Sequence, residues 1–148
     1  MKRTNSMRLR FVSVYQVPNH EALLYRLLKE RPRSMTISHK RMPTLAEHRK
    51  FVRLKPYGEW NFILQDKTIL GSIYLSNLNE IGIFLFKTFR GGMLETKVVR
   101  EFIARRRTLR LLANVSPKNS RYARIFRGLG FKLIQHSYCL EPLGRKRR

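Results

Sequence analysis

The stretch IGIFLFKTFRGGMLE, residues 81–95, decides which fold this chain favours and which chemistry it can support. Its first six residues, Ile81–Phe86, form a hydrophobic run typical of a strand. The basic glycine turn Phe89–Gly92 follows, and a helix-patterned segment begins after it. Small residues let a backbone approach phosphate closely, a helix N-terminus offers unpaired N–H groups, and Arg90 adds positive charge. The stretch therefore predicts a phosphate-binding turn between a strand and a helix.

Length and composition indicate one domain with a hydrophobic core. The chain has 148 residues, of which 43% are hydrophobic. No apolar run reaches membrane-spanning length, and Met1–Asn5 lack the apolar stretch of a signal peptide. The single cysteine, Cys139, excludes an internal disulfide and, with four scattered histidines, argues against a metal site. We expect a cytoplasmic domain with no membrane partner and no metal.

The charge balance is strongly basic. Thirty-two Lys and Arg residues face nine Asp and Glu residues, giving a formal net charge of +23. Such a field attracts polyanions, whereas solubility alone needs only a modest net charge. A solvated basic surface remains the alternative, but we expect a DNA or RNA partner. We predict a basic N-terminal tail at residues 1–8, a domain at 9–141 and a basic C-terminal tail at 142–148.

Hydrophobic periodicity and turn residues predict a mixed, mostly antiparallel sheet flanked by helices in a single α/β domain. Asn19 is expected to cap the first helix, and Thr44 and Glu47 form a capping box for the second. Ser116 and Pro117 are expected to start the last helix. The expected strands are 9–15, 60–65, 68–75, 80–86, 109–115 and 131–140, and the expected helices are 20–30, 45–55, 94–107 and 117–128.

Three features together resemble the GNAT superfamily of acetyl-CoA-dependent N-acyltransferases. They are the order of elements, the turn Arg90–Gly92 after the fourth strand, and the run from Asn114 to Ser120 that continues through Leu129-Gly130-Phe131. The resemblance covers about residues 60–133. It implies the GNAT fold, acetyl-CoA as cofactor, and direct transfer of the acyl group to an amine acceptor.

The resemblance also implies which residues hold the cofactor. Backbone groups around Ile83, Phe84 and Leu85 would meet the pantetheine arm, and Asn119 would contact it near the thioester. The turn and helix start would hold the pyrophosphate through Arg90, Gly91, Gly92, Met93 and Leu94.

The chain departs from the family pattern at several positions. The phosphate motif usually reads Arg/Gln-x-x-Gly-x-Gly/Ala, whereas its fourth and sixth places here are Met93 and Glu95. Glu95 would weaken phosphate binding unless it faces outward or pairs with Arg90. The family's usual tyrosine, which reprotonates the departing thiolate, is replaced by Phe126. Tyr122 and Tyr138 are the candidates for that role.

The remaining site candidates concern the acceptor. Glu80, at the start of the fourth strand, is the candidate general base, because a glutamate entering a sheet beside apolar residues suits proton removal. Tyr57 and Trp60 either line the acceptor pocket or pack in the core, and core packing is favoured. His39 and His48 lie near the family's acceptor region, but lone histidines are more often structural.

We therefore predict an acetyl-CoA-dependent N-acyltransferase whose acceptor amine is on or near nucleic acid, for example a modified DNA base. The alternatives are an acetyltransferase for a small amine such as an amino sugar, and a non-catalytic nucleic-acid-binding module on a degenerate GNAT fold. A polyamine acceptor is disfavoured because the basic surface repels cations.

Overall fold

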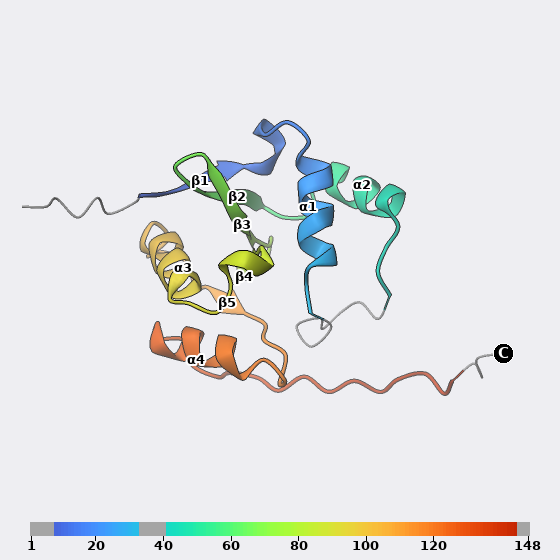
Figure 1. Cartoon of the computed structure of the whole chain (residues 1–148). Coiled ribbons are helices and arrows are strands. Elements are labelled where there is room, and N and C mark those ends of the chain that lie inside the picture. The colour runs from blue at the N-terminus through green and yellow to red at the C-terminus, as the bar shows by residue number, and fades with distance from the viewer. Residues whose placement is uncertain (1–7, 33–40, 145–148) are drawn as a thin grey trace, which may run out of the picture.

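Figure 1 shows the computed structural model of the chain, which describes residues 8–32 and 41–144. The predicted tails and His39 therefore lie largely or wholly outside the described residues. The elements are β1 (Leu9–Ser13), η1 (Val14–Gln16), α1 (His20–Lys29), α2 (Leu45–Arg53), β2 (Glu59–Gln65), β3 (Thr68–Leu75), β4 (Glu80–Leu85), η3 (Lys87–Phe89), α3 (Leu94–Ala104), β5 (Leu112–Ala113) and α4 (Ser120–Gly128).

The strands form one sheet in the order β1-β2-β3-β4-β5. β1 to β4 pair as antiparallel neighbours, and β5 pairs with β4 in parallel. The hairpin between β2 and β3 turns at Asp66, where a φ of 54° lies in the left-handed region that turns require. This sheet confirms the predicted mixed, mostly antiparallel α/β domain.

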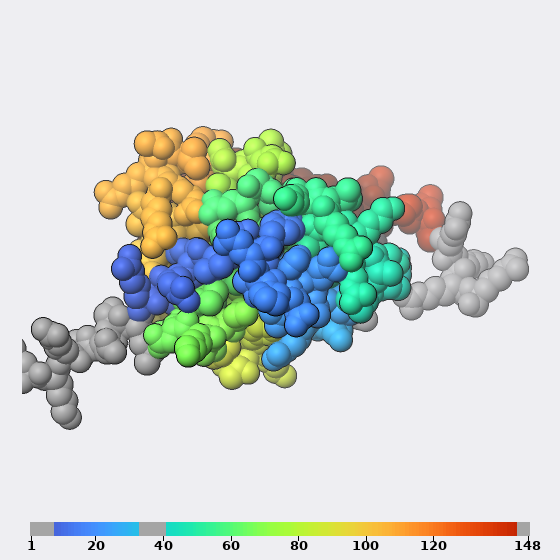
Figure 2. Space-filling model, turned by 90° about the horizontal axis from the view of Figure 1, so that it is seen from above, coloured from blue at the N-terminus to red at the C-terminus, as the bar shows by residue number. Residues whose placement is uncertain are grey.

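Helices cover both faces of the sheet (Figure 1). On one face, apolar residues of β3 and β4 pack with Val98, Val99 and Phe102 of α3 and with Phe126 of α4. On the other face, Leu24 and Leu27 of α1 and Val52 of α2 pack over β2. Figure 2 shows α1 and α2 side by side at the surface. The two faces of the sheet therefore contact different pairs of helices.

The helix starts follow local capping chemistry, with one correction. Thr44 Oγ1 accepts a hydrogen bond from Glu47 N at 3.2 Å, as the capping box predicts. Asn19 precedes α1 in a left-handed conformation and makes no side-chain cap. The last helix begins at Ser120, not at Pro117, because Ser116 Oγ instead accepts from Lys118 N at 3.3 Å and forms a turn.

The predicted strand at 131–140 is wrong, because the described structure has no strand after α4. Phe131 packs against Phe126, and the chain then runs extended and exposed, with Leu140 97% exposed (Figure 1). β5 is also shorter than the predicted 109–115 and pairs with β4 at only two positions. Strand-forming residues need a neighbouring ladder, and a two-residue edge strand offers almost none.

Among the helices within residues 8–32 and 41–144, none has the length and apolar character that spanning a membrane requires.

Candidate active site

β4 is paired with β5 along only the first part of its length. Ser76 N donates to Glu80 O and Phe86 N donates to Leu70 O, both at 2.9 Å, so the even-numbered residues of β4 turn their backbone groups toward β3. The backbone groups of Ile83 and Leu85 consequently face the other edge. β5 pairs with that edge only at Glu80 and Ile81. Beyond Ile81, the described sheet therefore presents an unpaired strand edge.

The glycine turn after β4 is open to solvent. Gly91 has a φ of 95°, which favours glycine, and a Cβ built on Gly91 or Gly92 would meet no atom within 4 Å. Met93 is the N-cap of α3 and its side chain is 79% exposed. The glycine turn and the N-cap of α3 are thus open to solvent, and they lie at the end of the open strand edge.

Arg90 is held by the protein backbone beneath this turn. Its Nε donates to Leu85 O at 2.9 Å, and Nη2 donates to Glu30 O at 2.6 Å. The guanidinium therefore ties the turn to β4 and to the end of α1, and it keeps a positive charge near α3's N-terminus. A direct contact between Arg90 and pyrophosphate stays a prediction.

Glu95 adopts neither of the two arrangements expected from the sequence. Its carboxylate is fully buried and forms an ion pair with Arg121 of α4. Arg121 also donates to Gly92 O at 3.4 Å. The negative charge beside the turn is consequently balanced from α4, and the same arginine links α4 to the turn.

Asn119 and Tyr122 lie together at the start of α4. Asn119 Oδ1 accepts a hydrogen bond from Tyr122 N at 3.2 Å, which leaves the Asn119 amide nitrogen for other partners. Burial and the neighbouring Glu95 raise the pKa of Tyr122 to about 12, although Arg121, Arg90 and Arg31 oppose the rise. Tyr122 therefore keeps its proton at neutral pH.

The other two catalytic candidates differ in location. Glu80 is partly buried at the start of β4, on the face opposite Ile81 and Ile83, and its charge contributes to raising the pKa of Tyr74. Glu80 also lines a groove of about 580 Å³ beside β5 and α4. Tyr138 is 92% exposed in the segment that was predicted as a strand. Tyr122 packs against the core on the face of the sheet that Ile81 and Ile83 line, so it is on the other face of the sheet from Glu80, and Tyr138 is outside the core.

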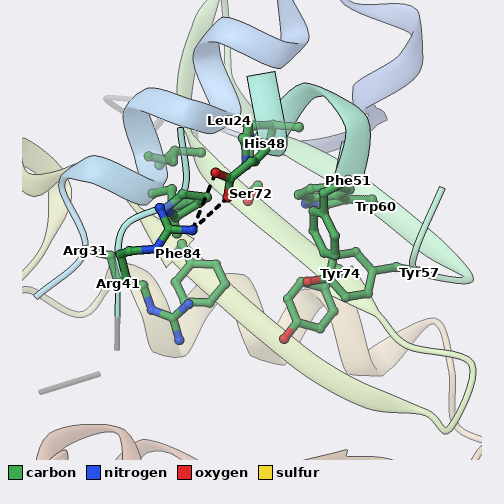
Figure 3. Close-up of a pocket in the computed structure, with 14 residues that line it drawn as sticks. Leu24, Arg31, Arg41, His48, Phe51, Tyr57, Trp60, Ser72, Tyr74 and Phe84 are labelled. Carbon is green, nitrogen blue, oxygen red and sulfur yellow. Dashed lines mark hydrogen bonds and ion pairs between the residues drawn. The ribbon is translucent and has the colours of Figure 1, made fainter. Parts of the chain in front are cut away.

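A cavity of about 490 Å³ lies between α1, α2 and the sheet (Figure 3). Tyr74 and Phe84 reach it from β3 and β4, and Gly82 lets Tyr74 lie across β4, because a Cβ there would overlap the tyrosine ring. Sequence reasoning considered Tyr57, Trp60 and His48, all of which line the cavity. The sequence gives no sign of Arg31, Arg41, Phe51 and Tyr74 in the cavity, because they come from separate elements with no shared spacing. Phe84 was expected to offer its backbone to the pantetheine arm, but its backbone groups turn toward β3 and its side chain lines the cavity.

A family model for the acetyltransferase (GNAT) domain matches residues 8–132. The chain belongs to the GNAT acetyltransferase family. The enzyme class and the acetyl-CoA cofactor predicted from the sequence are those of this family, and both predictions are confirmed. No curated protein sequence matches the chain.

Solved structures of GNAT acetyltransferases share the fold. The ribosomal-protein α-N-acetyltransferase RimL in complex with coenzyme A gives a TM-score of 0.68 at 17% identity, covering 88% of this chain and 83% of RimL. An acetyltransferase from Thermus thermophilus gives a TM-score of 0.62 at 18% identity, covering 86% of this chain and 88% of that protein. A phosphinothricin acetyltransferase from Sinorhizobium meliloti in complex with acetyl-CoA gives a TM-score of 0.61 at 20% identity, covering 86% of this chain and 76% of that protein.

The residues of this GNAT domain fit an acyl-CoA donor. Two open glycines precede a helix start that offers N–H groups to a pyrophosphate. The unpaired edge of β4 at Ile83 offers backbone groups to the amides of a pantetheine arm, whereas the Leu85 carbonyl already accepts from Arg90 Nε. Glu95, the one carboxylate in the first turn of α3, is neutralised by Arg121.

Proposed function

We propose that this GNAT protein is an acetyl-CoA-dependent N-acetyltransferase whose acceptor amine is carried on, or held near, a nucleic acid. The observation that carries the catalytic part is the unpaired edge of β4 that ends at an open glycine turn. The net charge of +23 supports a polyanionic setting for the acceptor. A modified DNA base and an RNA-associated protein are both acceptors of this kind. The single cysteine suits a reducing compartment, and we propose a cytoplasmic location.

The proposed reaction needs binding, orientation and two proton movements. When bound, acetyl-CoA supplies an acetyl group activated as a thioester. Gly91, Gly92 and the start of α3 would hold the pyrophosphate, and Ile83 and Asn119 would orient the pantetheine arm. The Glu80 carboxylate would accept a proton from the acceptor amine. The Tyr122 hydroxyl would supply a proton to the departing thiolate.

The cavity between α1, α2 and the sheet favours a second candidate, an acetyltransferase for a small free amine. A space of about 490 Å³ is of the size that holds a small molecule. In both candidates the donor site is the same, and only the acceptor differs.

The donor site is tested by the melting temperature in the presence of acetyl-CoA. We expect millimolar acetyl-CoA to raise the melting temperature, because a ligand that binds only the folded state stabilises it. Gly92→Asp should abolish the rise, since it adds a negative charge at the turn where no neighbouring atom obstructs a side chain. Gly144→Asp is the matched control, because it adds the same charge at another open glycine. No rise with the wild-type protein would favour the non-catalytic module instead.

A further inference from the structure

The groove of about 580 Å³ beside β5 has a strand edge along one wall and an extended chain along the other. Residues 110–115, which include β5, line one wall, and most of residues 131–137 line the other. β5 is the last strand in the order of the sheet, so its outer edge has no neighbour in the part of the chain that the structure describes. Among the same described residues, no backbone hydrogen bond joins the two walls. Two backbone edges without a ladder therefore line one groove.

The post-α4 segment, residues 131–140, has the composition of a buried strand. Its last eight residues, LIQHSYCL at 133–140, contain no Lys, Arg, Asp or Glu, although 28% of the chain is charged. Another uncharged run, 68–79, contains the central strand β3, most of which is buried. The post-α4 segment instead extends away from the sheet (Figure 1). Four of its large apolar side chains are between 62% and 97% exposed: Leu133, Ile134, Tyr138 and Leu140. Apolar side chains that are exposed together mark an interaction surface.

The charge of the protein restricts what covers this surface. A polyanion is drawn to the basic side chains and not to an uncharged apolar segment. Two copies of the chain, each with a net charge of +23, repel one another over most of their surface, and the repulsion is smallest where neither copy carries a charge. The groove already has Arg110, Arg127 and Lys132 in its lining against the single carboxylate of Glu80. An uncharged strand adds no further cation there, so residues 133–140 of a second copy suit the groove.

Two-fold symmetry allows one contact to pair both edges in both copies. A segment that enters the groove of a second copy lies between that copy's β5 and that copy's own post-α4 segment. The two-fold rotation then places the other segment in the first groove, and the two segments run antiparallel to each other. β5 and the post-α4 segment of one copy are joined through α4, a connection that favours parallel strands. The strand between them is then antiparallel to both neighbours.

We propose that the protein forms a two-fold dimer in which the post-α4 segments are exchanged. Each segment pairs with β5 of the other copy on one side and with the other segment on its second side. The exchange joins the two sheets into one and covers the four exposed apolar side chains. It also supplies the neighbouring ladder that residues 131–140 lack within one copy. The inference goes beyond the proposed function and does not depend on it.

Sedimentation equilibrium of the full chain tests whether the dimer exists. High salt is used, because it screens the repulsion between the copies and releases bound nucleic acid. We expect a dimer at micromolar protein concentration. A protein that remains a monomer up to millimolar concentration overturns the proposal.

Proline variants test whether the post-α4 segment makes the contact. Ser137→Pro removes one backbone donor from each segment of the dimer, and that N–H makes no backbone hydrogen bond within the described copy. We expect the dissociation constant of the dimer to rise at least tenfold, with the circular dichroism spectrum unchanged. Leu143→Pro is the matched control, because it places the same ring on the exposed chain just beyond the segment. A wild-type dissociation constant in Ser137→Pro, or an equal effect of the two prolines, overturns the proposal.

Hydrogen exchange followed by mass spectrometry locates the contact. We expect the amides of residues 131–140 and those of residues 112–115 to become protected together as the dimer fraction rises with protein concentration. Protection of residues 131–140 that is the same at every concentration would mean that something other than a second copy covers the segment, and would overturn the proposal. Protection that appears with the dimer only on other elements would overturn it as well.

Discussion

The two side chains proposed to move protons, Glu80 and Tyr122, differ in their surroundings. Glu80 is partly buried at the start of β4, where its backbone N–H donates to Ser76 Oγ at 3.0 Å. Tyr122 is close to the fully buried carboxylate of Glu95, which helps to keep the phenol protonated. The surroundings of Tyr122 therefore keep available the proton that its proposed role needs.

Glu80→Gln should lower kcat/KM at neutral pH by about 100-fold, the size of a typical general-base contribution. The rise in melting temperature with acetyl-CoA should persist, because Glu80 is not part of the proposed donor site. Steady-state kinetics and thermal unfolding measure the two effects, with Glu101→Gln on α3 as the control. An unchanged rate would remove Glu80 from its proposed role.

Tyr122→Phe should lower kcat by about tenfold or more, since it removes the proposed proton donor and keeps the ring. Because the pKa of Tyr122 is raised to about 12, the wild-type enzyme should show no loss of rate from its deprotonation below about pH 10. The pH profiles of kcat for the two proteins check this. A loss centred near pH ~9 that disappears in Tyr122→Phe would contradict it.

At the scale of elements, β4 serves two sites through its alternation. Ile81, Ile83 and Leu85 pack toward α3, while Phe84 on the opposite face lines the cavity. In the proposed function, the same strand offers its unpaired edge to the donor. The Glu95–Arg121 ion pair then joins α3 to α4, so the two helices that begin beside the donor site are held together.

Arg121→Met should lower the free energy of unfolding by about 3–5 kcal/mol, because it leaves the Glu95 carboxylate buried without its cation. Adding Glu95→Gln should recover much of the loss. Urea denaturation measures both variants. Arg41→Met, which breaks the exposed pair with Glu47, should cost only about 0–1 kcal/mol. A loss in Arg121→Met no larger than that of the exposed pair would contradict the expected role.

At the scale of the whole molecule, positive charge is the dominant property. The chain has 32 basic and nine acidic residues, and most of these basic residues belong to neither the donor site nor the cavity. It includes the terminal run Arg145–Arg148 and the pair Lys2 and Arg3. This excess of charge supports the proposed nucleic-acid setting of the acceptor.

Binding to duplex DNA or to RNA should weaken steeply as salt increases, because basic side chains release counterions from the phosphates. Fluorescence anisotropy over a salt series measures the slope. Replacing the six terminal basic residues by glutamine should leave most of the affinity if the binding face is on the folded domain. Affinity that does not respond to salt would contradict an electrostatic partner.

Several local features follow directly from neighbouring residues and were predictable. The capping box at Thr44, the hairpin at Asp66 and the strand, turn and helix around Arg90 depend on contacts close in sequence. The GNAT family was also predictable, because its motifs are short runs of neighbouring residues within about residues 60–133. The strand at 131–140 was mispredicted, since alternating residues form a strand only where a neighbour pairs with them.

The fold class, the family, the glycine turn and the excess of positive charge follow from the order of the residues, because local propensity, short motifs and composition carry them. The pairing of Glu95 with Arg121, the binding of Arg90 to backbone carbonyls and the position of Arg31 over the Phe84 ring become visible only in the folded chain. These contacts join residues from separate elements, and their partners are set by how helices pack on the sheet. The glycine turn at Arg90 can therefore be recognised from local sequence, whereas the side chains that surround it are set by long-range packing.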